Sequence, residues 1–390
     1  MKSILLGTAA VIAMSTTAMA QGQPIKIGFV STFSGPTAVI GNDMRNAFEL
    51  ALDHLGRKIG GRAVEVIYED DGQKPDIGRQ KSEKLVQSDK VDFVVGYIWS
   101  NVLLASLKPV ADSGTFLIST NAGPSQVAGE LCSPFFFTTS WQNDQTPAAI
   151  GEYMNQKGIK SLYLLGPNYA AGKDILGGVK SVFKGRIAGE DYTKWPDHLD
   201  FSADLSKVRA AKPEALFVFY PGAAGVQFLN QFNQAGLRGQ IPLYTAFTID
   251  ALSLPRQGDL ALGVPGTQHW VADLPNDANK KFVSDFKARY KAYPSFYAAQ
   301  TYDAANLIAS AVNAVKGDTS RKDAMRDAMR RADYASVRGP YRYNNNHFPI
   351  QNFYLQDVVK DADGVLTLKT AATVLKDAKD NFAEKCPMKW

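Results

Sequence analysis

The chain alternates short apolar runs with stretches in which apolar residues recur every three or four positions. Between the early runs, residues 43–54, 75–88 and 102–112 have the helical period. The runs themselves are rich in β-branched and aromatic residues and predict strands: "IKIGFVSTF", "AVEVIYEDD", "VDFVVGYI" and "TFLISTNA". Strand and helix alternating at this spacing predict right-handed βαβ units and a mostly parallel sheet.

The same rhythm restarts near Phe135. The second set of predicted strands is "FFFTTS", "SLYLLGPN", "RIAGEDYT", "ALFVFYP" and "IPLYTAF", and the helices between them cover residues 145–156, 170–183, 201–211 and 223–234. A chain of 390 residues exceeds the usual limit for one hydrophobic core, about 250 to 300 residues. We therefore expect an α/β protein with two lobes in tandem.

The pattern changes after Gly266. Helices are predicted over residues 276–290, 298–315 and 320–333, and a β pair around an Asn-rich turn follows. Because this last part has no clear core of its own, we expect it to return and complete both lobes. The expected N-terminal lobe is residues 24–141 plus 271–349, and the expected C-terminal lobe is residues 142–270 plus 350–385.

The N-terminus has the features of a secretory signal peptide. Lys2 supplies the positive charge, and residues 4–14 form an apolar segment of roughly 11 residues, short of the about 20 that span a bilayer. Ala18 and Ala20 form a small-x-small cleavage site, and no cysteine for a lipid anchor follows it. We expect cleavage after Ala20 and a periplasmic location.

The distribution of charge bears on whether the protein binds nucleic acid. The net charge of +5 is spread along the chain, and its densest basic segment, residues 320–333, mixes acids with its bases. That mixture is typical of a solvated helix face, so we expect no nucleic-acid partner.

Cys132 and Cys386 are the only cysteines, and an oxidising compartment favours a structural disulfide, with two free buried thiols as the alternative.

Motifs for enzyme chemistry are absent from the sequence. It contains no nucleotide-binding glycine motif, no zinc-protease motif and no nucleophile-elbow motif. The four histidines are scattered without metal-ligand spacing, and only His269 lies near a candidate loop. We therefore expect a protein that is not an enzyme and needs no metal or cofactor, with an exported hydrolase as the less favoured class.

Loops at the carboxyl ends of the predicted strands are the best place for a ligand in such a fold. Ser100 is predicted to cap a helix, where free backbone amides and the helix dipole favour an anion such as a carboxylate. Ala122 and Gly123 provide a second loop that a ligand could approach closely. Asn121 is a further candidate, and the aromatic candidates, each of which could instead pack in a lobe core, are Trp99, Tyr97, Tyr169, Tyr220 and Phe247. Together they predict an aromatic-lined crevice with one polar end.

Several segments resemble a known family over essentially the whole mature chain. They are "IKIGFVSTFSGPTAVIGNDMRNAFELALDHL", "VDFVVG", "LISTNAGPS", "GPNYAAGKD" and "TYDAANLIASAV". In this order they are similar to type I periplasmic solute-binding proteins, of the branched-chain amino acid group that serves ABC importers. The resemblance implies two Rossmann-like lobes with parallel sheets, joined by three crossover segments and closing on a ligand by hinge motion. It also implies membrane permease subunits as partners, and we expect a monomer.

The resemblance assigns roles to a few residues. In amino-acid binders of this family the ligand carboxylate meets the positions held here by Ser100, Ala122 and Gly123. The acid that pairs with the ligand ammonium aligns with Phe247. A buried ammonium without an anionic partner would cost several kcal/mol, whereas the ring of Phe247 can stack on an aromatic ligand.

The family's side-chain pocket is also altered. Tyrosine positions align with Ile40, Ala171 and the region of Ala223, so the pocket should be larger. We therefore expect an aromatic acid of the benzoate, phenylpropenoate or aryl-oxo acid type. Branched-chain amino acid binding is the alternative, because a slip in the alignment would place Asp250 near the missing acid. A sensing role through a membrane receptor also stays open.

Overall fold

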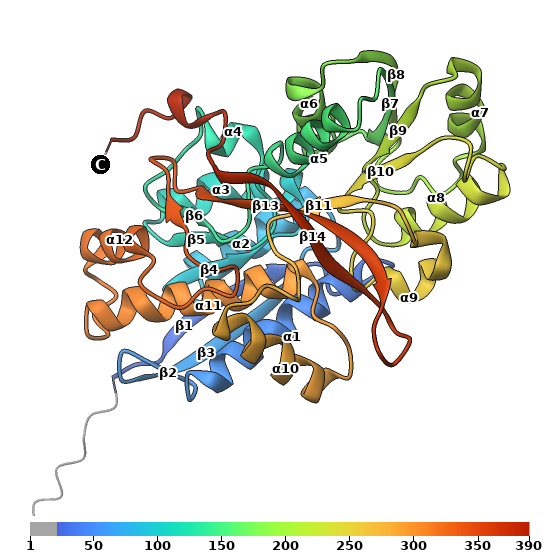
Figure 1. Ribbon diagram of the computed structural model, residues 1–390. Coiled ribbons are helices and arrows are strands. Elements are labelled where there is room, and N and C mark those ends of the chain that lie inside the picture. Colours follow the sequence, from blue (N-terminus) through green and yellow to red (C-terminus); the bar gives the residue numbers. More distant parts are fainter. Residues whose placement is uncertain (1–21, 390) are drawn as a thin grey trace, which may run out of the picture.

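The computed structural model describes residues 22–389 and contains two α/β lobes (Figure 1). The predicted signal peptide lies outside these residues. None of the described helices is long and apolar enough to cross a membrane.

The first lobe is built on a six-stranded sheet in the order β2-β3-β1-β4-β5-β6, parallel except for β2. Its strands are β1 (Ile25–Ser31), β2 (Lys58–Ile59), β3 (Arg62–Asp70), β4 (Phe93–Gly96), β5 (Phe116–Ser119) and β6 (Phe136–Thr138). Its helices are α1 (Ala38–His54), α2 (Pro75–Gln87), α3 (Ser100–Asp112), α4 (Ser125–Ala128), α10 (Asp277–Tyr290), α11 (Phe296–Ala314) and α12 (Lys322–Arg331). Strands β4 and β5 are buried at every position, which explains their continuous apolar runs.

The second lobe is built on an eight-stranded sheet in the order β12-β13-β11-β10-β9-β7-β8, with β14 paired to β13. Its strands are β7 (Ser161–Pro167), β8 (Arg186–Thr193), β9 (Ala215–Val218), β10 (Leu243–Ala246), β11 (Gly266–Gln268), β12 (Arg342–Tyr343), β13 (Pro349–Lys360) and β14 (Leu366–Ala378). Its helices are α5 (Gln145–Gln156), α6 (Ala170–Val182), α7 (Ser202–Ala211), α8 (Ala223–Gln234) and α9 (Leu254–Gln257). The parallel part ends at β11, because β13 runs antiparallel to it.

Most predicted elements are present. Helices α5 and α8 and strand β8 have the predicted bounds, and the Asn-rich turn joins β12 to β13. The sequence reading missed β14, a 13-residue strand whose long antiparallel pairing with β13 forms an extended hairpin. Its residues are mostly polar or exposed, so no sustained alternation of apolar and polar residues predicted a strand there.

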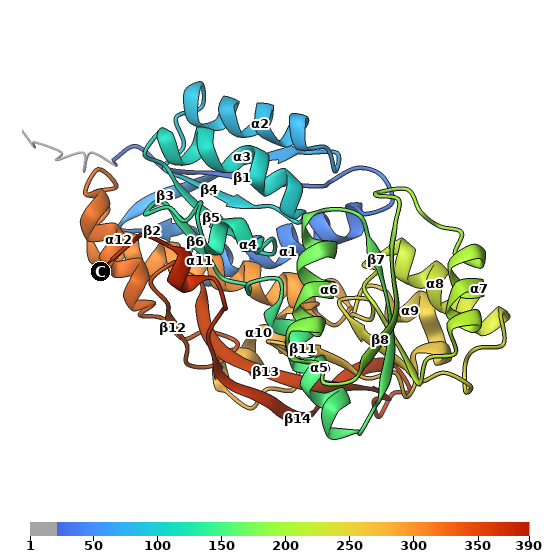
Figure 2. The same ribbon diagram turned by 90° about the horizontal axis from the view of Figure 1, so that it is seen from above.

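Among residues 22–389 the chain passes between the lobes after β6, after β11 and between α12 and β13, and its tail crosses once more after β14. Viewed from above, α6 of the second lobe faces α3 of the first (Figure 2). The buried guanidinium of Arg338 ties two crossovers together, since it donates hydrogen bonds to the carbonyls of Thr139 and Ser140 and to Gln351 Oε1 at 2.7 Å. It also pairs with Asp303 at 3.2 Å. We call this group the hinge cluster.

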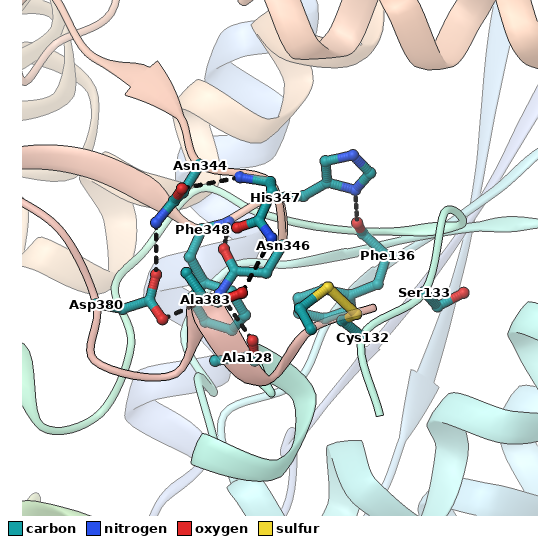
Figure 3. Close-up of a disulfide and its surroundings, with 12 residues drawn as sticks. Ala128, Cys132, Ser133, Phe136, Asn344, Asn346, His347, Phe348, Asp380 and Ala383 are labelled. Carbon is teal, nitrogen blue, oxygen red and sulfur yellow. Dashed lines mark hydrogen bonds between the residues drawn. A yellow bond between two sulfur atoms is a disulfide. The ribbon is translucent and has the colours of Figure 1, made fainter. Parts of the chain in front are cut away.

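The C-terminal tail is fastened to the first lobe. Cys132, just after α4, forms a disulfide with Cys386, as predicted from the even cysteine count (Figure 3). Nearby, the Asp380 carboxylate accepts hydrogen bonds from the side-chain amides of Asn344 (3.3 Å) and Asn346 (3.0 Å). The tail therefore returns from the second sheet to the first lobe.

Candidate functional site

A narrow cavity, partly open to solvent, lies between the two lobes. It is lined by Ile98, Trp99, Ser100, Asn121, Ala122, Trp141, Asn143, Tyr169, Ala171, Ile175, Phe219, Pro221, Phe247 and Tyr297. None of these side chains carries a formal charge at neutral pH. An apolar, aromatic-lined space with a few polar groups is typical of a small-molecule site.

Trp99 forms the wall where the lobes meet. Its indole Nε1 donates to Thr32 Oγ1 at 2.9 Å, and that hydroxyl donates to Asp71 Oδ1 at 2.5 Å. The ring is 98% buried and faces Tyr169 and Trp195 of the second lobe, with centroid separations of 6.5 and 4.9 Å. Trp99, which lies between the end of β4 and the start of α3, therefore provides a contact surface for the opposite lobe.

Ser100 supplies the polar end of the cavity. The expected role as helix cap is wrong: Trp99 occupies the N-cap position and Ser100 is the first residue of α3. Its backbone N–H, like that of Asn101, belongs to the first turn and has no intrahelical acceptor. The Ser100 hydroxyl oxygen accepts a hydrogen bond from Asn143 Nδ2 at 3.1 Å. The helix start still favours an anion.

The loop at Ala122 and Gly123 does not offer its amides to a ligand, contrary to expectation. Ala122 N–H donates to the Tyr97 carbonyl at 3.0 Å, and Gly123 N–H donates to Asn143 Oδ1 at 3.2 Å. Gly123 is not part of the cavity lining. A Cβ there would lie 1.9 Å from the Trp141 carbonyl oxygen, so close packing against the first crossover requires the glycine.

Phe247 forms an aromatic wall opposite the polar end. Its ring stacks on Trp141 with centroids 4.6 Å apart and planes at 23°, and it packs against Phe219 and Phe296 at 5.8 and 5.6 Å. The backbone of Phe247 has φ +60°, a left-handed conformation that non-glycine residues adopt at a cost of about 1 kcal/mol or more. Strain of this kind is concentrated at ligand sites.

The other sequence candidates divide between the cavity and the lobe cores. Asn121 and Tyr169 line the cavity, and Asn121 is held by a bond from its Nδ2 to the Ile98 carbonyl at 2.7 Å. Tyr97 lies in the first core, where its hydroxyl bonds Ser82 Oγ. Tyr220 lies in the second core. Neither lines the cavity, because both side chains are buried in the core clusters.

Asp250 lies outside the cavity lining, in a separate hollow with Ile40 and Ala223. Its Oδ1 accepts the backbone N–H groups of Leu252 (2.7 Å) and Ser253 (3.0 Å). Burial raises the pKa of Asp250 to about 6. Its carboxylate is therefore committed to its own turn.

Sequence reasoning missed several cavity residues. Trp141 and Asn143 follow β6, so the rule that ligands bind at carboxyl ends of strands could have found them. Tyr297 lies at the start of α11, far along the sequence, and no local signal marked it. The hydroxyls of Tyr169 and Tyr297 form no hydrogen bond among residues 22–389, which leaves them available to a ligand.

Comparisons with known proteins agree with this arrangement. A family model described as "Periplasmic binding protein" matches residues 24–363. The Leu/Ile/Val-binding protein homolog 6 of Brucella melitensis biotype 1 is 28% identical, over 96% of this chain and 98% of that protein.

Two solved structures are 30% identical. One is an ABC-transporter solute binding protein from R. palustris in complex with benzoate (TM-score 0.88, covering 94% of this chain and 100% of that one). The other is a solute binding protein from Rhodopseudomonas palustris BisB5 in complex with 3,4-dihydroxy benzoic acid (TM-score 0.84, covering 92% and 99%).

Proposed function

This chain belongs to the periplasmic binding protein family, as an ABC-transporter substrate-binding protein of the Leu/Ile/Val-binding type, and from that premise we propose that its ligand is an aromatic carboxylate. The ligand class is that of a benzoate, phenylpropenoate or aryl-oxo acid. The protein captures it in the periplasm as a monomer, by closure of the two lobes, and delivers it to a membrane permease.

The observation that carries this proposal is the absence of any acidic side chain from the described cavity lining. An amino acid would bring a buried ammonium that needs an anionic partner, and without one its burial would cost several kcal/mol. The position expected to hold that partner is Phe247, which presents a ring stacked on Trp141. Such a wall suits a flat aromatic ligand, since offset or edge contacts add about 0.5 to 1.5 kcal/mol per ring pair.

The branched-chain amino acid alternative depended on Asp250. That carboxylate lies in a different hollow and accepts two backbone N–H groups of its own turn. The two relatives with bound benzoate and 3,4-dihydroxy benzoic acid support the aromatic alternative, although each result belongs to that relative.

Closure follows from the placement of the walls. Trp99 and Ser100 come from the first lobe, and Tyr169 and Phe247 from the second. A ligand touches both sets only when the lobes close, so its binding energy favours the closed form. Ser100 and the first turn of α3 hold the carboxylate, while the aromatic walls hold the ring.

A thermal-unfolding screen of refolded, ligand-free protein tests the proposal. Benzoate, other aromatic carboxylates, leucine and valine are compared side by side, and a ligand at about 100 times its dissociation constant should stabilise by roughly 2.7 kcal/mol. Ser100→Ala and Phe247→Ala should weaken the response, whereas Tyr220→Phe, in the second core, should not. A response to leucine or valine alone would refute the proposal.

A further inference from the structure

Asn143 connects the polar end of the cavity to the opposite lobe. It lies in the first crossover, between β6 and α5, and is 97% buried. Its Nδ2 donates to Ser100 Oγ at 3.1 Å and to Asp174 Oδ2 at 3.0 Å, while its Oδ1 accepts the Gly123 N–H at 3.2 Å. The amide orientation is therefore fixed, because a flipped amide would place its NH₂ against the Gly123 donor and its oxygen against the Asp174 acceptor.

This orientation determines what Ser100 can do. Its oxygen already accepts a hydrogen from Asn143, and its own hydroxyl hydrogen has no acceptor among the described residues. Ser100 is 99% buried and lines the cavity. A buried hydroxyl needs a partner, so the remaining hydrogen is left for a ligand atom that accepts.

Asp174 makes the arrangement depend on lobe closure. It belongs to α6 of the second lobe, yet it accepts the backbone N–H of Ser125 at 2.9 Å and the Ser125 hydroxyl at 2.8 Å at the start of α4 in the first lobe. Opening the cleft would separate these groups. The chain of hydrogen bonds thus runs from one lobe, through the crossover, to the cavity.

We propose that Asp174 is a positioning residue that, through Asn143, holds the Ser100 hydroxyl ready to donate a hydrogen bond to a ligand in the closed cleft. The cleft then favours ligands with an acceptor group, a carboxylate, at this position, because the free hydroxyl hydrogen needs an acceptor. This inference rests on the proposed function and deepens it, since it names the residues that set the direction of the hydrogen bond to the ligand.

The test exchanges the two side chains. The double variant Asn143→Asp/Asp174→Asn keeps the shapes and the net charge, and the new amide at position 174 can donate to the new carboxylate at position 143, at the cost of the hydrogen bond from the Ser125 backbone N–H to position 174. Ser100 must then donate to that carboxylate and presents only an acceptor to the cavity. Benzoate and benzylamine are titrated by calorimetry against the wild type, the double variant and Asp191→Asn. The last is a matched control in the second lobe, where Asp191 pairs with Lys207 outside the cavity.

We expect benzoate to bind the folded double variant at least about 10-fold more weakly, because Ser100 no longer donates a hydrogen bond to it and the carboxylate at position 143 lines the cavity. The ratio of the affinity for benzoate to the affinity for benzylamine should also fall in the double variant. The Asp191→Asn variant should keep the wild-type affinity ratio. A folded double variant with the wild-type ratio would overturn the inference and leave the proposed function intact. A wild-type protein that binds no aromatic carboxylate would overturn both.

Ser125→Ala provides a second measurement if the double variant does not fold. It removes one hydrogen bond to Asp174 without touching the cavity, so the closed form loses stability. We expect benzoate to dissociate faster, by stopped-flow, with little change in the association rate. An unchanged dissociation rate would count against the link between Asp174 and closure.

Discussion

Replacing Arg338 by methionine should strongly destabilise the protein, because it removes the centre of the hinge cluster. The Arg338 and Asp303 side chains are only 2% and 0% exposed. In the variant, Asp303 keeps only the Ser336 hydroxyl and the Val337 N–H as donors. Removing one partner of a buried ion pair typically costs about 3 to 5 kcal/mol, since the other charge remains buried and unpaired.

The loss is measured as the free energy of unfolding in urea, with Arg342→Met as the matched control. Arg342 pairs with Asp377 at 3.0 Å, but these side chains are 61% and 69% exposed, so that change should cost about 1 kcal/mol or less. Adding Asp303→Asn to Arg338→Met should recover part of the loss, because it removes the unpaired charge. A cost for Arg338→Met no larger than that for Arg342→Met would refute the reasoning.

Three other predictions concern the disulfide, the buried acid Asp43 and one glycine. The double variant Cys132→Ser/Cys386→Ser, which opens a link between residues 254 apart, should lose about 2 to 5 kcal/mol of unfolding free energy in urea; an unchanged urea midpoint would contradict this. Burial raises the pKa of Asp43 from 3.8 to about 7, so the folded state binds more protons than the unfolded state between these values. The unfolding free energy should therefore fall as pH rises from about 4 to 7, by up to roughly 1.4 kcal/mol per pH unit for this group, and Asp43→Asn should flatten the profile. Gly123→Ala should destabilise by about 1 to 3 kcal/mol, because its Cβ would meet a crossover carbonyl oxygen at 1.9 Å, whereas Gly129→Ala, with 3.4 Å of room, should cost less; equal unfolding temperatures would refute the packing argument.

Much of the site could be predicted from strand ends alone. Trp99, Ser100, Asn121, Tyr169 and Phe247 all follow predicted strands and all line the cavity. The rule works because parallel strands bring their carboxyl ends to one edge, whatever the details of packing.

The site predictions that were wrong share a different cause. Tyr97 and Tyr220 also follow strands but point into the lobe cores, and the loop amides at Ala122 and Gly123 are bonded within the protein. A backbone turn of one residue moves a side chain from one face to the other, and no pattern in the sequence fixes that turn.

The sequence by itself determined the two α/β lobes and indicated the aromatic character of the cleft, because hydrophobic period and residue type act locally; it favoured the disulfide without deciding it. Only the tertiary structure decided which groups meet. Ser100, Asn143 and Asp174 lie on α3, a crossover and α6, and their hydrogen bonds join residues 31 and 43 positions apart. Such bonds depend on how the lobes close, and therefore on the packing of the whole molecule.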